Sequence, residues 1–310
     1  MKKKITEEAH RLGFNLVGFT SPGLDNKHIQ AYETWLRSGF SARMTYMEKI
    51  EKRKELSKVL PNIKTVICLA TNYYHPQDPL SKAGARVARY AYGRDYHKII
   101  SRRLKKLKEH INDLKKGVSS LEYIDTGPIL ERAYAQKCGL GFIGKNSCLI
   151  TKKYGSWIFL SEILTTLELE PDKESNIKEG DVCGSCSLCV NTCPMKAIVA
   201  PGVIDASRCI SYLSIENRGE KIPDELQQKL KEQKKFFGCD ICQEVCPHNA
   251  GKTSPCDQEF LAKKIAGDEI DPKEILKIKN DEQFVKKFAG SPLMRAKRKN
   301  LQLISSILSD

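Results

Sequence analysis

Hydrophobic and polar positions follow the periods of helices and strands through the first 170 residues. Ile5, Ala9 and Leu12 share one face of a predicted helix, which leads into the short strand FNLVGF. Apolar residues recur at helical spacing over 98–115 and alternate with Lys and Arg, which predicts an amphipathic helix. The other predicted elements are helices over 28–37 and 128–137, and strands over 66–70, 121–124, 147–151 and 157–164. This mixture indicates an α+β domain over residues 1–170.

The pattern changes after residue 170. The polar segment PDKESNIKEGD is typical of a linker, and cysteines then crowd into residues 183–246. After Cys256 short helical patterns return, ending in the basic run MRAKRKN and the apolar LQLISSIL. We therefore expect a second domain over 171–255 and a short helical basic tail over 256–310.

Composition narrows the class of protein. The 310 residues include 12 cysteines, and Lys and Arg exceed Asp and Glu by 14. No apolar stretch approaches the ~18 residues that span a bilayer, and ITEEAHRLG follows MKKK where a signal peptide would be apolar. We expect a cytoplasmic protein without membrane association, whose reduced cysteines serve metal binding or catalysis. The basic excess favours an anionic partner such as nucleic acid, although a soluble basic protein can also lack one.

The cysteine spacing carries the strongest chemical signal. Residues 183–194 follow the bacterial ferredoxin pattern C-x2-C-x2-C-x3-C-P, in which three cysteines hold one [4Fe–4S] cluster and the fourth reaches a second cluster. The run C-x2-C-x3-C-P over 239–247 supplies the last three positions of the second half, with Cys209 as its first ligand. The predicted ligands are Cys183, Cys186, Cys189 and Cys246 for one cluster, and Cys193, Cys209, Cys239 and Cys242 for the other.

Other interpretations of the cysteines remain open. C-x2-C pairs also suit zinc, although two reciprocal C-P runs argue against it. Four further cysteines, Cys68, Cys138, Cys148 and Cys256, lack ligand spacing and are expected to be buried structural thiols. Paired clusters transfer single electrons, so the larger domain before them is expected to hold a redox centre. No G-x-G-x-x-G follows a predicted strand, which weakens a Rossmann nucleotide site.

Several long segments closely resemble epoxyqueuosine reductases. They are RYAYGRDYHKII (89–100), DTGPILERAYAQKCGLGFIGKN (125–146), YGSWIFLSEILT (154–165) and RCISYLSIENRG (208–219), in the same order as in that family. The resemblance implies a cobalamin-dependent iron–sulfur enzyme, related to reductive dehalogenases, that reduces epoxyqueuosine to queuosine at the wobble position of tRNA. It also implies a nitroreductase-like cobalamin-binding domain beside the ferredoxin domain.

The resemblance assigns a proton-donor role to Asp125. Cleaving a C–O bond leaves an oxyanion, and a nearby carboxylic acid could protonate it. For that role Asp125 should be protonated near neutral pH, which requires burial or a neighbouring like charge. The alternative is structural, because Asp125 or Thr126 precedes Pro128 and could cap a helix.

The resemblance also implies a set of cobalamin contacts. In addition to Asp125 these are Arg53, Ala88, His97, Leu149 and Leu160, with His97 expected at the corrin edge rather than on the cobalt. Some relatives have a cysteine where Ala88 stands, so a cysteine at the cobalt is in doubt here. Leu149 and Leu160 alone are typical of ordinary strand core. The glycine-rich turn of Gly141, Gly144, Lys145 and Asn146 suits either close cofactor approach or a plain turn.

A tRNA substrate would explain the basic balance, because phosphate contacts dominate nucleic-acid affinity. The candidate contacts are Arg208, Tyr212, Asn217 and Arg218, together with Lys297, Arg298 and Lys299 in the tail; a solvated charged face is the alternative. The chain leaves little room for the helical-repeat domain that many members append. We also expect an external low-potential electron donor and a monomer. The competing functions are an electron-transfer protein and a cobalamin-dependent small-molecule reductase of the dehalogenase type.

Overall fold

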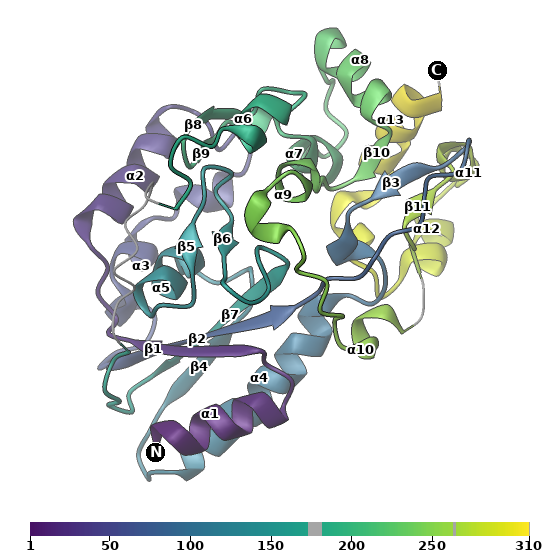
Figure 1. The fold of residues 1–310 in the computed structure, drawn as a ribbon. Helices are drawn as coiled ribbons and strands as arrows, with labels where there is room; N and C mark the ends of the chain where they lie inside the picture. Colours follow the sequence, from purple (N-terminus) through teal and green to yellow (C-terminus); the bar gives the residue numbers. More distant parts are fainter. Residues whose placement is uncertain (173–181, 263–264, 310) are drawn as a thin grey trace.

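The computed structural model describes residues 1–172, 182–262 and 265–309, so residues 173–181 of the predicted linker lie outside the described residues. A four-stranded antiparallel sheet forms the centre of the amino-terminal part (Figure 1). Its strands, in spatial order, are β1 (Leu16–Thr20), β2 (Thr65–Asn72), β7 (Ile158–Thr165) and β4 (Ser120–Tyr123).

Alternation along the central strands builds one apolar core on each face of the sheet. On β2, Ile67 and Leu69 pack with α1 (Lys2–Arg11) and α4 (Tyr96–Asp113), whereas Val66 and Cys68 point to the opposite face. The short helix α5 (Glu131–Lys137) covers that second face. Both central strands are therefore buried on both sides.

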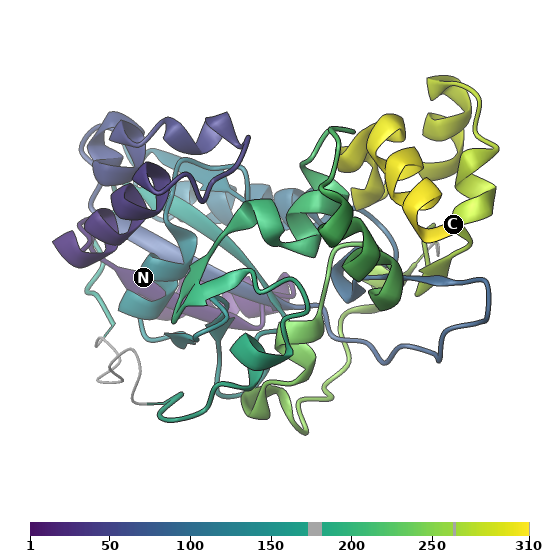
Figure 2. The same cartoon turned by 90° about the horizontal axis from the view of Figure 1, so that it is seen from above.

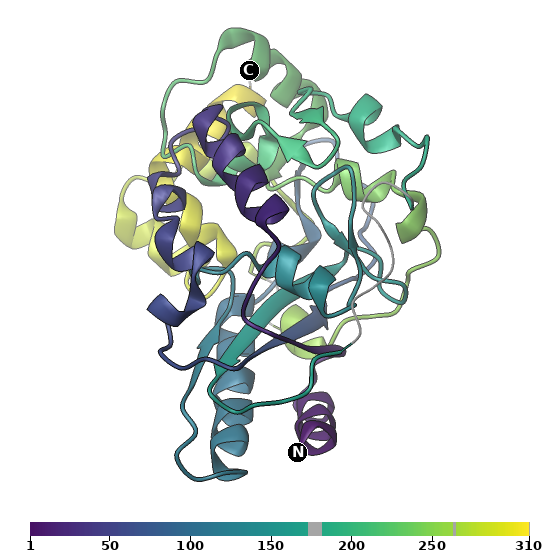
Figure 3. The same cartoon turned by 90° about the vertical axis from the view of Figure 1, so that its left-hand side faces the viewer.

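Smaller elements surround this sheet. The helices α2 (Asn26–Arg37) and α3 (Glu51–Lys54) fill the connection between β1 and β2. A hairpin of β5 (Phe142–Ile143) and β6 (Leu149–Ile150) connects α5 to β7. Figure 3 shows α1 and the far end of α4 at one end of the molecule and the carboxyl-terminal helix near the other.

A third core joins parts of the chain that are far apart in sequence. Its three-stranded sheet has the order β10 (Lys235–Phe237), β3 (Ala85–Val87), β11 (Glu269–Ile270), one strand from each of the three predicted domains. In Figure 2 the chain after β2 crosses toward the yellow carboxyl-terminal helices. The helices of this core are α7 (Ile210–Ile215), α8 (Asp224–Gln233), α11 (Pro272–Leu276), α12 (Asp281–Phe288) and α13 (Lys297–Ser309). The predicted tail is thus helical, and it packs into a shared core.

The cysteine-bearing segment contains only short regular elements. Its regular elements are α6 (Leu188–Thr192), the hairpin of β8 (Ile198–Ala200) and β9 (Val203–Ile204), and α9 (Ile241–Glu244). The helix α10 (Gln258–Leu261) follows and packs against α4. No helix in the described ranges is both long enough and apolar enough to cross a membrane.

The predicted elements of the first 170 residues are all present, with ends shifted by up to three residues. The helix predicted over 128–137 begins at Glu131, with Leu130 as its N-cap. Neither Asp125 nor Thr126 caps a helix, so that alternative role for Asp125 is wrong. The strands β3, β10 and β11 were not predicted because each has only two or three residues and depends on distant partners.

Candidate active site and cluster-binding region

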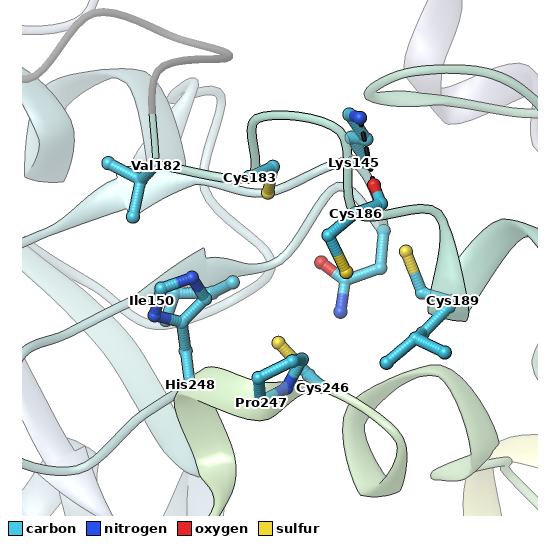
Figure 4. A pocket seen from close by; sticks show the side chains of 11 residues that line it. Lys145, Ile150, Val182, Cys183, Cys186, Cys189, Cys246, Pro247 and His248 are labelled. Atoms are coloured by element: carbon cyan, nitrogen blue, oxygen red, sulfur yellow. Dashed lines mark hydrogen bonds between the residues drawn. The ribbon is translucent and has the colours of Figure 1, made fainter.

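The four cysteines assigned to the first cluster line one cavity of about 180 Å³. Figure 4 shows the sulfur atoms of Cys183, Cys186, Cys189 and Cys246 around a common space. Burial raises the pKa of the Cys189 thiol, and the other three thiols add to this effect. Within the described ranges, no three His, Cys, Asp or Glu side chains converge closely enough to hold one metal ion. The cavity thus brings together the four thiols that the sequence assigns to one cluster.

The cysteines assigned to the second cluster form another group beside α7 and β10. Burial raises the pKa of Cys239 to about 12, and the nearby Cys209 thiol contributes to the increase. The Cys193 thiol in turn contributes to the raised pKa of Cys209. Cys209 and Cys239 both contribute to the raised pKa of Cys242. Buried neutral thiols of this kind lose their protons when iron binds. The grouping is the one predicted from the sequence, in which the last cysteine of each run ligates the cluster of the other run (the crossed ligand assignment).

Lys145 and Asn146 connect the glycine-rich turn to the cysteine loops. The Nζ atom of Lys145 donates hydrogen bonds to the carbonyl oxygens of Gly184 (2.7 Å) and Cys186 (2.8 Å), the second of which is drawn in Figure 4. Asn146 donates from Nδ2 to the carbonyl oxygen of Cys242 at 3.1 Å. One turn of the amino-terminal part therefore holds the backbone of both cluster loops.

The glycines of this turn serve the β5–β6 hairpin. A Cβ atom at Gly141 would lie 2.3 Å from the carbonyl oxygen of Ile150, a backbone atom with little freedom to move. At Gly144 it would lie 2.7 Å from the Cδ1 atom of the same residue. The close approach in the structure is thus between the strands of the hairpin.

Three of the four remaining cysteines, Cys68, Cys138 and Cys256, are buried as predicted. Cys148 is different, because it is only partly buried and its side chain is within hydrogen-bonding distance of Cys242. It therefore belongs to the surroundings of the second cluster.

Asp125 and His97 form the charged centre of the candidate active site. The Nε2 atom of His97 lies 3.2 Å from Oδ2 of Asp125, and the hydroxyl of Tyr96 donates to the same oxygen at 3.2 Å. Asp95 caps α4 and orients the imidazole, because its Oδ1 atom lies 2.7 Å from Nδ1 of His97. The loop before α5 presents Asp125 in a left-handed conformation with φ of 56°. Its backbone N–H donates to Oε1 of Glu131 at 2.8 Å.

This geometry contradicts the expectation that Asp125 is protonated near neutral pH. Desolvation opposes ionisation of its carboxyl, but the hydrogen bonds and charge of His97 outweigh that effect, and the pKa lies below its ordinary value. Burial would lower the pKa of His97, but the carboxylates of Asp125 and Asp95 raise it to about 9. At neutral pH the proton of the pair therefore resides on His97.

Two other residues of the predicted cobalamin set, Ala88 and Arg53, are buried in different parts of the fold. Ala88 is 2% exposed, and its N–H donates to the carbonyl oxygen of Phe237 in β10, two residues before Cys239. Arg53 is buried in α3, with its guanidinium 6.0 Å from the ring of Tyr32. Among the described residues, Arg53 donates a side-chain hydrogen bond only to the carbonyl oxygen of Lys49.

The two leucines of that set lie in the core on the α5 face of the sheet. Leu149 is buried, and Leu160 packs against the same core with part of its surface open. No hydrogen bond or ion pair of the described residues joins Arg53 or Ala88 to Asp125. The structure therefore brings His97 and Asp125 into direct contact, and among the described residues no side-chain hydrogen bond links this pair to the other four predicted residues.

The predicted tRNA contacts differ in their accessibility. Tyr212 and Asn217 are buried, and their polar atoms are hydrogen-bonded inside the protein. Arg208 donates from Nε to the carbonyl oxygen of Met195 at 2.9 Å. Arg218 has 49% of its side chain exposed, in a turn with φ of 61°. The two arginines, rather than Tyr212 and Asn217, present charge at the surface.

The basic tail meets this same turn. The N–H of Gly219 donates to Oδ1 of Asn300 in α13 at 3.0 Å, so the exposed Lys297 and Lys299 lie near Arg218. Arg298 is less available, because its Nε atom pairs with Oδ1 of Asp281 at 2.7 Å. Arg218 of the first group therefore lies close to the exposed lysines of the tail.

Tyr46 and Arg295 border the site and were not predicted. The guanidinium of Arg295 lies 5.7 Å from the ring centre of Tyr46 and donates to Oε1 of Glu216 at 2.7 Å. The positive charge of Arg295 contributes to the lowered pKa of Asp125, and the charge of Asp125 to the raised pKa of Tyr46. Tyr46 is 43% exposed. An aromatic residue within the polar segment SARMTYMEK was the only signal for it in the sequence.

Comparisons with known proteins agree with this arrangement. Residues 53–126 match the family described as Epoxyqueuosine reductase QueG, DUF1730, and residues 182–249 match the 4Fe-4S double cluster binding domain. An epoxyqueuosine reductase of Atelocyanobacterium thalassa is 38% identical over 304 residues, covering 95% of this chain and 96% of that protein. The chain belongs to the epoxyqueuosine reductase family. Another member, from Gloeobacter violaceus, is 41% identical over 79% of this chain and 75% of its own length.

Solved structures of the epoxyqueuosine reductase family extend the match to the whole fold. A crystal structure of an epoxyqueuosine reductase with an epoxyqueuosine-modified tRNA stem loop has a TM-score of 0.86 and 29% identity, and covers 99% of this chain and 80% of that chain. A selenomethionine-labelled member has a TM-score of 0.87 and 28% identity over the same shares. The double-cluster match identifies the cysteine-rich segment as an iron–sulfur module.

Proposed function

We propose that this protein reduces epoxyqueuosine in tRNA to queuosine, the last step of queuosine formation. The observation that carries the proposal is the His97–Asp125 pair, which holds a proton within reach of the charge of Arg295 in a chain of this family. Removing an epoxide oxygen as water consumes two electrons and two protons. The iron–sulfur module accounts for the electrons, and the pair for at least one proton.

The residues present fit a cobalamin cofactor in the amino-terminal part. Among the described residues the Arg53 guanidinium donates a side-chain hydrogen bond only to the carbonyl oxygen of Lys49, which leaves N–H groups for a ligand. Leu160 is only partly buried, and Ala88 pairs with β10, the strand that precedes Cys239. A donor set of this kind suits a large ring with amide side chains. When bound, reduced cobalamin would supply electrons to the epoxide at a potential that the clusters can reach. We infer a nitroreductase-like domain on this basis, with Asp125 and Leu149 completing the site.

His97 and Asp125 would act on the substrate oxygen. In the resting pair the proton lies on His97, and Tyr96 donates a further hydrogen bond to the same carboxylate oxygen. When an oxyanion develops nearby, proton transfer from His97 through Asp125 would neutralise it. Asp95 keeps the imidazole in the orientation that this transfer needs.

The tRNA would bind over the surface formed by Arg218, Lys297 and Lys299, with Arg208 as a further candidate contact. This surface is continuous with Arg295, whose charge reaches Asp125. A base splayed out of a single-stranded loop could therefore enter the site while its phosphates contact the rim. We also propose that one chain suffices, that an external low-potential donor reduces the clusters, and that the activity is cytoplasmic because tRNA is its substrate.

The two competing functions make different predictions. A simple electron carrier would take up no corrinoid, and a small-molecule reductase would act without tRNA. We expect anaerobically reconstituted protein to bind one cobalamin, seen as a shift of corrinoid absorbance during titration, and to reject the free epoxyqueuosine nucleoside relative to modified tRNA. Failure to bind a corrinoid would overturn the cofactor assignment, and equal turnover of nucleoside and tRNA would overturn the substrate assignment.

A further inference from the structure

A buried carboxyl pair lies directly behind the candidate proton donor. Glu162 occupies the middle of β7 and is 0% exposed. Neither of its carboxylate oxygens accepts a hydrogen bond from an N–H or O–H donor of the described residues. Instead, its side chain lies within hydrogen-bonding distance of the carboxyl of Glu131 at the start of α5. Two carboxyl groups can share such a bond only if one of them carries a proton.

Glu131 connects this pair to Asp125. Its Oε1 atom accepts the hydrogen bond from the backbone N–H of Asp125 at 2.8 Å, and the negative charge of Asp125 acts on Glu131 and on Glu162. A series of contacts therefore links the buried Glu162, through Glu131, to the loop that presents Asp125 to His97.

The surroundings of the pair favour its protonated form. Burial raises the pKa of Glu131 to about 7 and that of Glu162 well above its ordinary value. The neighbouring titratable groups are Asp125 from the loop, Cys138 from the end of α5, Cys68 from β2 and Arg132 from α5. Only Arg132 is cationic among these, and its effect on Glu131 is smaller than those of burial and Asp125. A buried, uncompensated carboxylate would be costly, so the pair keeps a proton.

We propose that Glu131 and Glu162 form a protonated carboxyl pair that positions Asp125 for proton transfer. This inference rests on the proposed function. The pair contacts Asp125 through the backbone N–H of that residue, so the glutamates give no proton to the substrate. While it is protonated, the pair holds the Asp125 loop without adding much negative charge behind the Asp125 carboxylate. Loss of its proton would place a further negative charge there and repel that carboxylate. The epoxide takes up two electrons from the reduced clusters and two protons, each delivered by His97 and Asp125, which solvent then reprotonates. Neither glutamate touches the substrate, so both are positioning residues.

The protonated Glu131–Glu162 pair has a spectroscopic signature that does not depend on turnover. At pH 6, where exposed carboxyls are ionised, infrared spectra of the chain should contain the C=O band of a protonated carboxylic acid. Glu162→Gln, which preserves shape, should remove this band, and Glu131→Gln should do the same. Glu122→Gln is the matched control. Glu122 lies on the neighbouring strand β4, beside Tyr123, which pairs with Glu162 in the sheet. Its carboxylate is ion-paired with Lys108 at 2.6 Å, so it is ionised. Its replacement should leave the band unchanged. Absence of the band from the unmodified chain would overturn the proposal, whether or not the variants fold.

Kinetics provide the second arm. With reconstituted enzyme and modified tRNA, Glu162→Gln should lower kcat about tenfold, less than the 10²–10⁴-fold expected for loss of a direct proton donor. It should also remove the fall in kcat above about pH 7 that deprotonation of Glu131 predicts. Unchanged kcat and pH profile in Glu162→Gln would refute the positioning role of the pair. A band in the unmodified chain without any turnover of the tRNA would instead refute the proposed function and leave the protonated pair standing.

Discussion

The Nε2 atom of His97 lies 3.2 Å from Oδ2 of Asp125, so the first turn of α4 is joined to the loop before α5. The two residues are 28 positions apart in sequence. Because of this contact the proton resides on the imidazole of His97, and not on Asp125 as the sequence predicts.

The His97 pair should be visible in the pH dependence of folding. The pKa of His97 is raised to about 9 in the folded protein, so its contribution to stability is complete below about pH 6.5 and is lost as pH rises through about 9. Urea unfolding of the wild type and of His97→Gln should show a stability difference that shrinks between pH 7 and pH 10. Histidine NMR titration should give a value near 9 for His97 that falls in Asp125→Asn. A His97 titration near 6.5 in the wild type would contradict the pairing.

Replacing Lys145 should loosen the first cluster. Lys145→Met removes both hydrogen bonds to the carbonyl oxygens of Gly184 and Cys186 while keeping an apolar stem. We expect iron content after anaerobic gel filtration to fall from about eight per chain toward about four, since each cluster has four irons. Lys152→Met, at an exposed position beyond β6, is the control and should retain its iron. Equal retention in both variants would mean that Lys145 does not hold the loop.

The crossed ligand assignment makes Cys209 indispensable. Cys209→Ala should lose one cluster, seen as a halved iron content and a weaker electron paramagnetic resonance signal of the reduced protein. Cys256→Ala removes a buried thiol outside both groups and should keep both clusters. If iron stays near eight per chain in Cys209→Ala, another residue is the fourth ligand.

The basic surface formed by Arg218, Lys297 and Lys299 should determine the salt dependence of tRNA binding. Arg218→Gln removes one exposed cation, so the slope of log affinity against log salt should decrease in magnitude by about 0.7–0.9 for each phosphate that the side chain neutralises. Lys4→Gln changes the same net charge on α1, at the other end of the molecule (Figure 3), and should leave the slope unaltered. Filter binding of a tRNA stem loop over a salt series measures both. Identical slopes for Arg218→Gln and the wild type would remove Arg218 from the interface.

The long elements could be predicted because their signals are local. The helical spacing of Ile100, Leu104 and Leu107 in α4 and the apolar run of β2 need no knowledge of partners. The cysteine groups were predictable for a related reason, since the spacing of each ferredoxin run is local and its last cysteine, before proline, is known to ligate the other cluster.

The rest of the site depends on contacts between distant segments. Arg295 acts on Asp125 from the turn before α13, where it is ion-paired with Glu216 at the end of α7, a contact that no periodicity indicates. The ionisation of Asp125 depends on its contact with His97, and the protonation of Glu131 on burial beside Glu162. These are tertiary properties, and sequence alone led to the wrong protonation state for Asp125.

The most direct test is conversion of tRNA that carries epoxyqueuosine, using protein reconstituted anaerobically with iron, sulfide and cobalamin and driven by a chemical reductant. Nucleoside mass spectrometry should show loss of one oxygen atom with the wild type only when cobalamin is present. Asp125→Asn, with both clusters retained, should be slower by 10²–10⁴-fold, as expected for a lost proton donor. Asp113→Asn, at the exposed end of α4, should match the wild type. Unchanged epoxyqueuosine after incubation with fully loaded wild-type enzyme would contradict the account.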